Sequence, residues 1–112
     1  MSDFAPLPDP PYYAVIFTAQ LTVNTAGYAA MADQMGTLAA QQPGYLGIET
    51  TRNDTGLGIT VSYWADQAAL QNWKAVTQHT LAQEMGRERW YSHYTLRVAK
   101  VERHYDGPKG RN

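Results

Sequence analysis

The chain has 112 residues, no cysteine and a net charge of −1 from nine basic and ten acidic residues. This length predicts a single small domain, and the near-neutral charge argues against nucleic acid as a partner, because binding to phosphates requires a basic surface. The lack of cysteine excludes disulfides, thiolate catalysis and zinc–thiolate sites, and without an apolar run of about 18 residues or a signal peptide we expect a cytoplasmic protein with no membrane partner.

We divide the chain into a Pro-rich leader over residues 1–12, one folded domain over 13–106 and a flexible tail over 107–112. The prolines of the leader favour an extended conformation. Apolar side chains alternate over 13–21, with Phe17 at the centre, which predicts the first strand.

The first helix is predicted to begin near Ala26, with Asn24 or Thr25 as its cap. Pro43 lies beyond its end, since proline cannot continue a helix. One apolar stripe at helical spacing is expected to face the core. Its members are Tyr28, Met31, Met35, Leu38 and Ala39.

Two strands are predicted next, over 45–52 and 57–64, joined by a turn at 53–56. In the first of them, strict alternation places Ile48 on one face and Tyr45 on the other. The second of these two strands ends in the neighbouring aromatic residues Tyr63 and Trp64. This stretch is the most informative in the chain, because neighbouring aromatic residues are what a pocket for a flat organic molecule would need.

Asp66 is the expected cap of a second helical region, which we predict in two pieces, over 67–74 and 77–85. The last strand is predicted over 91–105 from its two-residue periodicity. Fifteen residues exceed the roughly 5–6 of a typical strand, so we expect it to extend beyond its own sheet.

The order strand, helix, strand, strand, helix, strand predicts an α+β, ferredoxin-like fold with an antiparallel sheet. Two helices can cover only one face of that sheet. The uncovered face carries tyrosines and aliphatic side chains, so we expect a homodimer that packs sheet against sheet.

Two segments resemble the antibiotic biosynthesis monooxygenase superfamily: QPGYLGIE at residues 42–49 and YWADQAALQNWK at residues 63–74. The resemblance covers about 13–105. It implies a dimeric α+β barrel in which each subunit holds a pocket between sheet and helices. Members of the superfamily include cofactor-free oxygenases of aromatic polyketides, small-quinol oxygenases and haem-degrading enzymes.

The sequence holds no metal-ligand cluster and no Gly-rich phosphate loop, so we expect neither a metal nor another cofactor. A phenol or quinol that loses its proton can react with dioxygen unaided, provided that a base and a dry aromatic slot are present. His79 is the candidate base, because imidazole titrates near neutral pH. The candidate substrate-binding residues are Trp73, Trp64 and Phe17 as stacking or lining groups and Tyr63, Tyr94 and Arg52 as hydrogen-bond donors.

Two other functions stay open. Haem degradation in this superfamily uses an asparagine on the first strand, where this chain has Ala19 and Gln20, and a histidine farther from the tryptophan than His79 is from Trp73. A dimeric barrel that only binds a small aromatic molecule, or serves as an accessory subunit, is the non-catalytic alternative.

Overall fold

The computed structural model describes residues 3–85 and 90–108, and of residues 81–85 only the backbone. The elements follow in the order β1 (Tyr12–Leu21), α1 (Tyr28–Ala40), β2 (Tyr45–Arg52), β3 (Leu57–Trp64), α2 (Gln67–Met85) and β4 (Tyr91–Val101). The strands form one antiparallel sheet in the order β2-β3-β1-β4. This topology confirms the predicted ferredoxin-like α+β fold.

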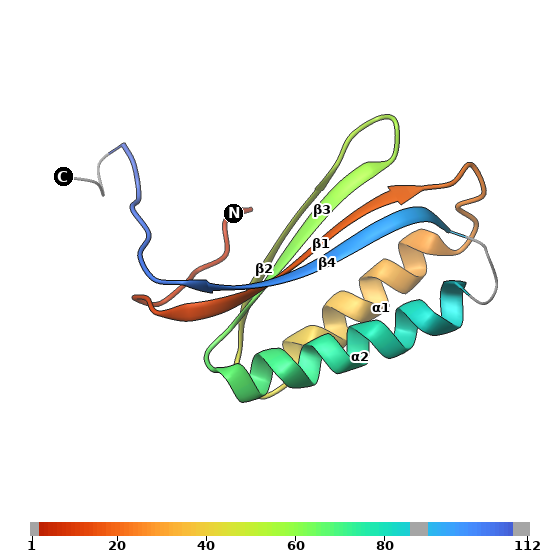
Figure 1. Cartoon of the computed structure of the whole chain (residues 1–112). Coiled ribbons are helices and arrows are strands. Elements are labelled where there is room, and N and C mark those ends of the chain that lie inside the picture. The colour runs from red at the N-terminus through yellow and green to blue at the C-terminus, as the bar shows by residue number, and fades with distance from the viewer. Residues whose placement is uncertain (1–2, 86–89, 109–112) are drawn as a thin grey trace.

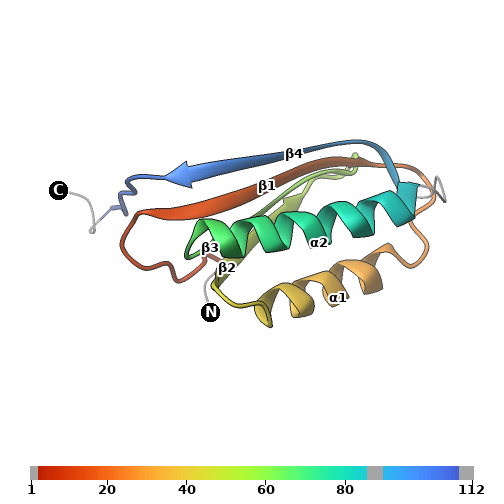
Figure 2. The same cartoon turned by 60° about the horizontal axis from the view of Figure 1, so that its bottom comes forward.

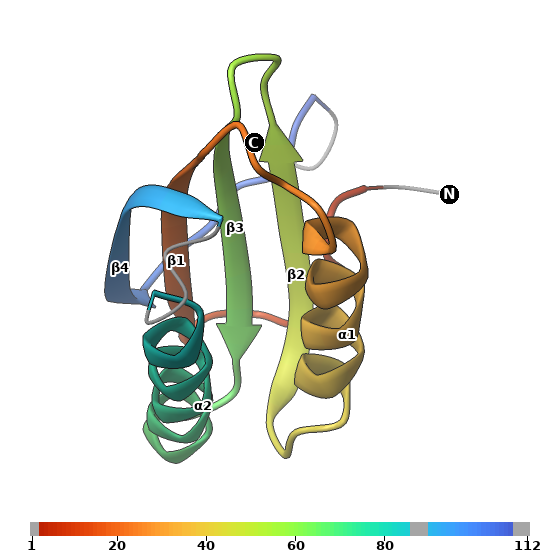
Figure 3. The same cartoon turned by 90° about the vertical axis from the view of Figure 1, so that its right-hand side faces the viewer.

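Both helices lie on one face of the sheet (Figure 1 and Figure 2). In Figure 3, α1 runs beside β2, and α2 contacts the middle strands β1 and β3. The other face of the sheet carries no helix in residues 3–85 and 90–108. In the part of the chain that the structure describes, neither helix is long and apolar enough to cross a bilayer.

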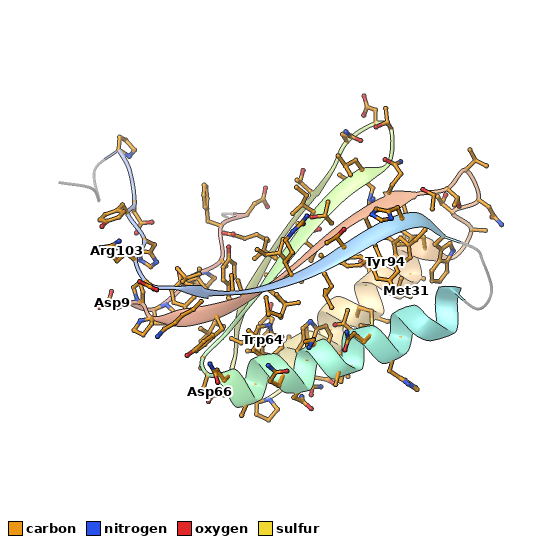
Figure 4. All side chains as sticks on the ribbon, viewed as in Figure 1. Asp9, Met31, Trp64, Asp66, Tyr94 and Arg103 are labelled. Carbon is orange, nitrogen blue, oxygen red and sulfur yellow. The ribbon has the colours of Figure 1, made fainter. Side chains whose placement is uncertain are left out.

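Two stacked tryptophans form the core at one end of the molecule. Trp64 at the end of β3 is fully buried, and its ring lies 5.5 Å from that of Trp73 on α2, with 25° between the planes. The indole Nε1–H of Trp64 donates to Ser62 Oγ at 3.0 Å, which satisfies a buried polar group. Figure 4 shows Trp64 between the sheet and the start of α2. This stack fixes α2 on the sheet.

A second cluster packs at the other end of the same layer. Its buried members are Ala19, Trp90 and Tyr91. The indole of Trp90 donates to Ala26 O at 2.9 Å, which ties the start of β4 to the segment before α1. Met31 and Tyr94 pack against this cluster and lie together in Figure 4.

The first helix differs from its prediction. It begins at Tyr28, and the preceding Gly27 has a φ of 83°, a left-handed conformation that favours glycine. The N–H of Tyr28 bonds to Thr25 O in a turn, so the predicted cap by a side chain of Asn24 or Thr25 is wrong. Leu38 is also exposed, whereas the other members of the predicted stripe face the sheet, so the predicted stripe is one residue too wide at Leu38.

Three other differences concern α2, β4 and β2. The second helical region was predicted in two pieces, but α2 is one continuous helix. Its predicted cap is confirmed, because Asp66 Oδ1 accepts from the N–H of Ala69 at 2.8 Å. β4 ends at Val101 because its partner strand begins at Tyr12, which pairs with Val101. A register shift at the start of β2 turns Tyr45 toward the helices, where simple alternation placed it on the other face.

Segments outside the helices and strands cover one end of the open face. The Ala5 N–H donates to Glu49 Oε2 at 3.0 Å, which holds the leader against the sheet. The second oxygen of Glu49 accepts from the Tyr63 hydroxyl at 2.6 Å. Beside them, the hydroxyl of Tyr12 and Nδ1 of His104 share a hydrogen bond of 2.6 Å. Burial, followed by the hydrogen bond to Glu49, raises the pKa of Tyr63 above its ordinary value.

This pKa shift predicts an alkaline loss of stability. The unfolded chain loses the Tyr63 proton near pH ~10 while the folded chain keeps it, so the free energy of unfolding falls as the pH rises above about 10. We expect Tyr63→Phe to flatten this decline in urea unfolding measured from about pH 8 to about pH 11. The control is Tyr105→Phe, whose ring is exposed. Equal declines in wild type and Tyr63→Phe would contradict the assignment.

Candidate functional site

A cavity of about 120 Å³ lies between the helix-covered face of the sheet and the two helices. Both helices and all four strands contribute to its wall. The described lining residues are Val15, Phe17, Tyr28, Met31, Ala32, Met35, Gly36, Ile48, Thr60, Ser62, Trp73, Thr77, Thr80, Tyr91 and Leu96. Helical spacing brings the lining residues of α1 to one side, and two-residue spacing does so for each strand.

The lining is mostly aromatic and apolar. Phe17 and Tyr91 meet edge to face with ring centroids 5.5 Å apart, and Tyr91 meets Tyr28 in the same way at 5.8 Å. Met31 and Met35 form the α1 wall, and methionine adapts its shape to irregular ligands. This combination suits a small, flat organic molecule.

The polar groups of the lining are hydroxyls. Thr60 shares a hydrogen bond of 2.6 Å with Thr50, and Thr80 donates to Val76 O at 3.0 Å. Ser62 accepts from an indole, as described above. None of the described lining residues carries a charge, and no group of three His, Asp or Glu that could hold a metal ion occurs in the described part of the chain.

An arginine stands behind the lining at one end of the cavity. Arg52 Nη2 donates to the Tyr28 hydroxyl at 2.9 Å, and the guanidinium also lies over the Tyr28 ring, 5.2 Å from its centroid. Its Nη1 donates to the carbonyl oxygens of Ala19 and Gly56. The partners of this cation are therefore neutral in the described part of the chain, and the cation polarises Tyr28.

Gly58 provides the space for this guanidinium. A Cβ built on Gly58 would overlap the Cζ, Nη1 and Nη2 atoms of Arg52, which lies opposite it on β2. Glycine is needed here for the approach of a side chain and not for its backbone freedom, because no positive φ occurs at this residue.

The structure brings only some of the predicted site residues together. Phe17 and Trp73 line the cavity, and Arg52 reaches it through Tyr28. Trp64 lies behind Trp73, where stacking on the neighbouring indole takes the place of stacking on a ligand. Tyr94 packs on Phe17 outside the lining.

Two predicted residues lie elsewhere. Tyr63 points to the open face and bonds to Glu49, because neighbouring strand residues face opposite ways and Trp64 occupies the helix side. His79 is exposed and is absent from the described lining, since the cavity face of α2 carries Trp73, Thr77 and Thr80 at helical spacing. The expectation that Tyr63 and His79 line the pocket is corrected accordingly.

Sequence reasoning missed most of the α1 wall. A methionine stripe at helical spacing is usually core, so the sequence pattern predicts Tyr28, Met31 and Met35 as core residues. It does not indicate Thr77 as a cavity residue either. The available signal was its spacing of four residues from Trp73, which puts both on the same face of α2.

The fit between Gly58 and Arg52 yields a prediction for stability. Gly58→Ala should displace the guanidinium and lower the free energy of unfolding by about 1–3 kcal/mol through lost hydrogen bonds. In an Arg52→Ala background the same change should cost much less, because the overlap is gone. Urea unfolding of the four proteins measures this coupling. An equal cost in both backgrounds would contradict the proposed overlap.

The arrangement is similar to several known proteins. The chain is 50% identical over 104 residues to the uncharacterized protein YqjZ of Bacillus subtilis, covering 92% of this chain and 91% of that protein. Solved structures share the fold at low sequence identity. PA3566 of Pseudomonas aeruginosa is 17% identical to this chain and has a TM-score of 0.63, and the match covers 87% of this chain and 98% of that protein. SnoaB of Streptomyces nogalater, a cofactor-independent oxygenase, is 13% identical, with a TM-score of 0.64 over 89% and 100%.

The sequence pattern of one protein family accounts for the centre of the chain. The pattern described as antibiotic biosynthesis monooxygenase matches residues 23–85, which span α1, β2, β3 and α2. More than half of the chain is therefore covered, including the segments at 42–49 and 63–74. This protein belongs to the antibiotic biosynthesis monooxygenase family.

Proposed function

We propose that the protein is a cofactor-independent monooxygenase that oxidises a small phenol or quinol with dioxygen. The observation that carries this proposal is the aromatic, uncharged cavity between the sheet and both helices in a chain of this family. The similarity to SnoaB, a cofactor-independent oxygenase, supports the same reaction class.

The reaction balances without an added reductant. A phenol or quinol with a hydrogen on a ring carbon next to a hydroxyl group loses four electrons, and one dioxygen takes them up. One oxygen atom is bonded to that ring carbon in the quinone product, and the other leaves as water with two hydrogens of the substrate. From methylhydroquinone, the products are a hydroxy-methyl-benzoquinone and water. The protein has to hold the ring, favour its phenolate and keep bulk water away from the reactive carbon.

Cavity size limits the substrate. A cavity of about 120 Å³ is close to the roughly 150 Å³ that binds benzene in an engineered protein, and is well below the roughly 300–1,000 Å³ of sites for drug-sized ligands. We therefore expect a substrate with one aromatic ring, and a polycyclic polyketide or haem would require the helices to move apart.

Arg52 and Tyr28 are the groups best placed to favour the phenolate. Tyr28 accepts a hydrogen bond from Arg52, which leaves its own proton available for a substrate oxygen at that end of the cavity. The positive charge behind Tyr28 stabilises a developing oxyanion, and the released proton passes to solvent. In this scheme the exposed His79 takes no part.

One observation favours the non-catalytic alternative. Tyrosines are the only ionisable side chains among the described lining residues, so a base that titrates near neutral pH is missing from that set. A protein that binds an aromatic ring without oxidising it would have the same lining. Binding without oxygen uptake is the result that would identify this function.

Filling the cavity should abolish the activity. Ala32→Leu adds bulk on the cavity wall, and we expect oxygen uptake with methylhydroquinone to fall at least tenfold with the free energy of unfolding unchanged or raised. The matched control is Ala30→Leu on the exposed side of α1.

Arg52→Gln should lower turnover by about 10²-fold, because it removes the positive charge behind Tyr28.

His79→Ala distinguishes phenolate stabilisation by Arg52 and Tyr28 from the sequence-based hypothesis that His79 is the base. We expect this variant to keep its turnover within about twofold of wild type, whereas loss of a general base would lower turnover by about 10²–10⁴-fold. Labelled dioxygen should place one oxygen atom in the product. If labelled oxygen stays out of the product while the ring still binds, the protein is the non-catalytic binder.

We further propose that the protein forms a homodimer through the open face of the sheet. Leu57 and Ile59 are each 42% exposed on that face, and Val61 continues the same row. With Phe4 of the leader, Ile59 and Val61 border a shallow hollow. Apolar side chains in this number on one face favour burial against a second copy.

An interface of this kind should bury on the order of 800 Å² per subunit. Ile59→Lys places a charge at its centre and should convert a dimer to a monomer in light scattering at micromolar concentration, because an unpaired charge is costly to bury. Leu38→Lys, on the exposed side of α1, is the control. A wild-type monomer, or a dimer that tolerates Ile59→Lys, would contradict this interface.

A further inference from the structure

One hydroxyl of the cavity wall has no hydrogen-bond partner among the described residues. Thr77 Oγ1 is buried and makes no hydrogen bond in the structure. The helical threonines Thr37 and Thr80 behave differently, because each donates to the carbonyl oxygen four residues earlier, at 3.1 and 3.0 Å. Thr77 forgoes this bond, so a buried donor and acceptor goes unused on a residue that lines the cavity.

A second hydroxyl lies on the sheet side of the same cavity. Ser62 is 3% exposed, and its Oγ accepts from the Trp64 indole. A serine hydroxyl can also donate, and no acceptor for the Ser62 proton occurs among the described residues. The cavity lining thus includes a residue of α2 with an unused hydroxyl and a residue of β3 with a partly used hydroxyl.

Rotation of Thr77 about χ1 can bring its hydroxyl to the cavity. Threonine in a helix populates two χ1 rotamers, and exchange between them swaps a hydroxyl for a methyl group of similar size. A ligand oxygen would then provide the missing partner. The neutral character of both hydroxyls fits an uncharged oxygen and disfavours a carboxylate, which would be buried without a cation in contact.

We propose that Thr77 and Ser62 form a hydrogen-bonding subsite for a second oxygen on the ring of the ligand. This inference rests on the proposed function, in which Tyr28 and Arg52 bind the first, phenolic oxygen. It narrows the ligand class to single rings with two uncharged oxygen substituents, such as a quinol or its monoether. The Thr77 hydroxyl is kept for binding, at a cost to the stability of the empty protein.

Two phenols of matched shape test the subsite. The probes 4-methoxyphenol and 4-ethylphenol share the phenolic oxygen and differ in whether an ether oxygen replaces a methylene group. We expect wild type to bind 4-methoxyphenol about five- to tenfold more tightly in NMR titrations. Thr77→Val should remove this preference and leave the affinity for 4-ethylphenol unchanged.

Stability gives a second, independent readout. Thr77→Val removes an unsatisfied hydroxyl and should raise the melting temperature of the empty protein by about 4 °C or more. Ser62→Ala should also remove the preference but lower the melting temperature, because the Trp64 indole loses its acceptor. The control is Thr37→Val, because Thr37 lies outside the cavity lining and its hydroxyl already donates to Asp33 O. It should leave the preference unchanged and should not raise the melting temperature.

The outcomes separate the two proposals. If both phenols bind wild type equally, or Thr77→Val keeps the preference or is no more stable than wild type, the subsite is refuted while the proposed function stands. If neither phenol binds wild type, the proposed function fails, and the subsite fails with it.

Discussion

The stack of Trp64 on Trp73 is the contact on which the rest of the molecule depends. It joins the end of β3 to the second turn of α2, and it buries two of the largest side chains of the chain. Removing a buried tryptophan costs about 3–5 kcal/mol, which is a large part of the stability of a domain this small. The stack also sets the height of α2 above the sheet, and so the depth of the cavity that Trp73 lines.

The cavity combines an uncharged lining with a positive charge placed close behind it. Its shape is held by apolar packing and aromatic edges, while the charge of Arg52 stays behind Tyr28. A cation in direct contact with the ligand would attract any anion. In the proposed function, the cation acts through the Tyr28 hydroxyl and favours the one ligand oxygen that this hydroxyl can reach, and the described lining of the cavity stays uncharged.

The sequence was sufficient for the fold and insufficient for the site. Alternation and turn residues locate the four strands, and Asp66 marks the start of α2, because these signals act within a few residues. The pocket depends on which face each residue takes after packing. Tyr63 and Trp64 are neighbours in a strand and cannot share a face, and His79 misses the cavity because the orientation of α2 is set by Trp73. The register shift that turns Tyr45 inward has no local signal at all.

The contact between Arg52 and Gly58 has a consequence for how this site can change over time. The two residues face each other across β2 and β3, and the guanidinium fills the space that a side chain at position 58 would need. A larger residue at 58 is compatible only with a smaller one at 52, so the order of substitutions matters. A path that first loses Arg52 is open, and a path that first enlarges Gly58 is obstructed. The charge behind the cavity is therefore easy to lose by drift and difficult to regain once position 58 is occupied.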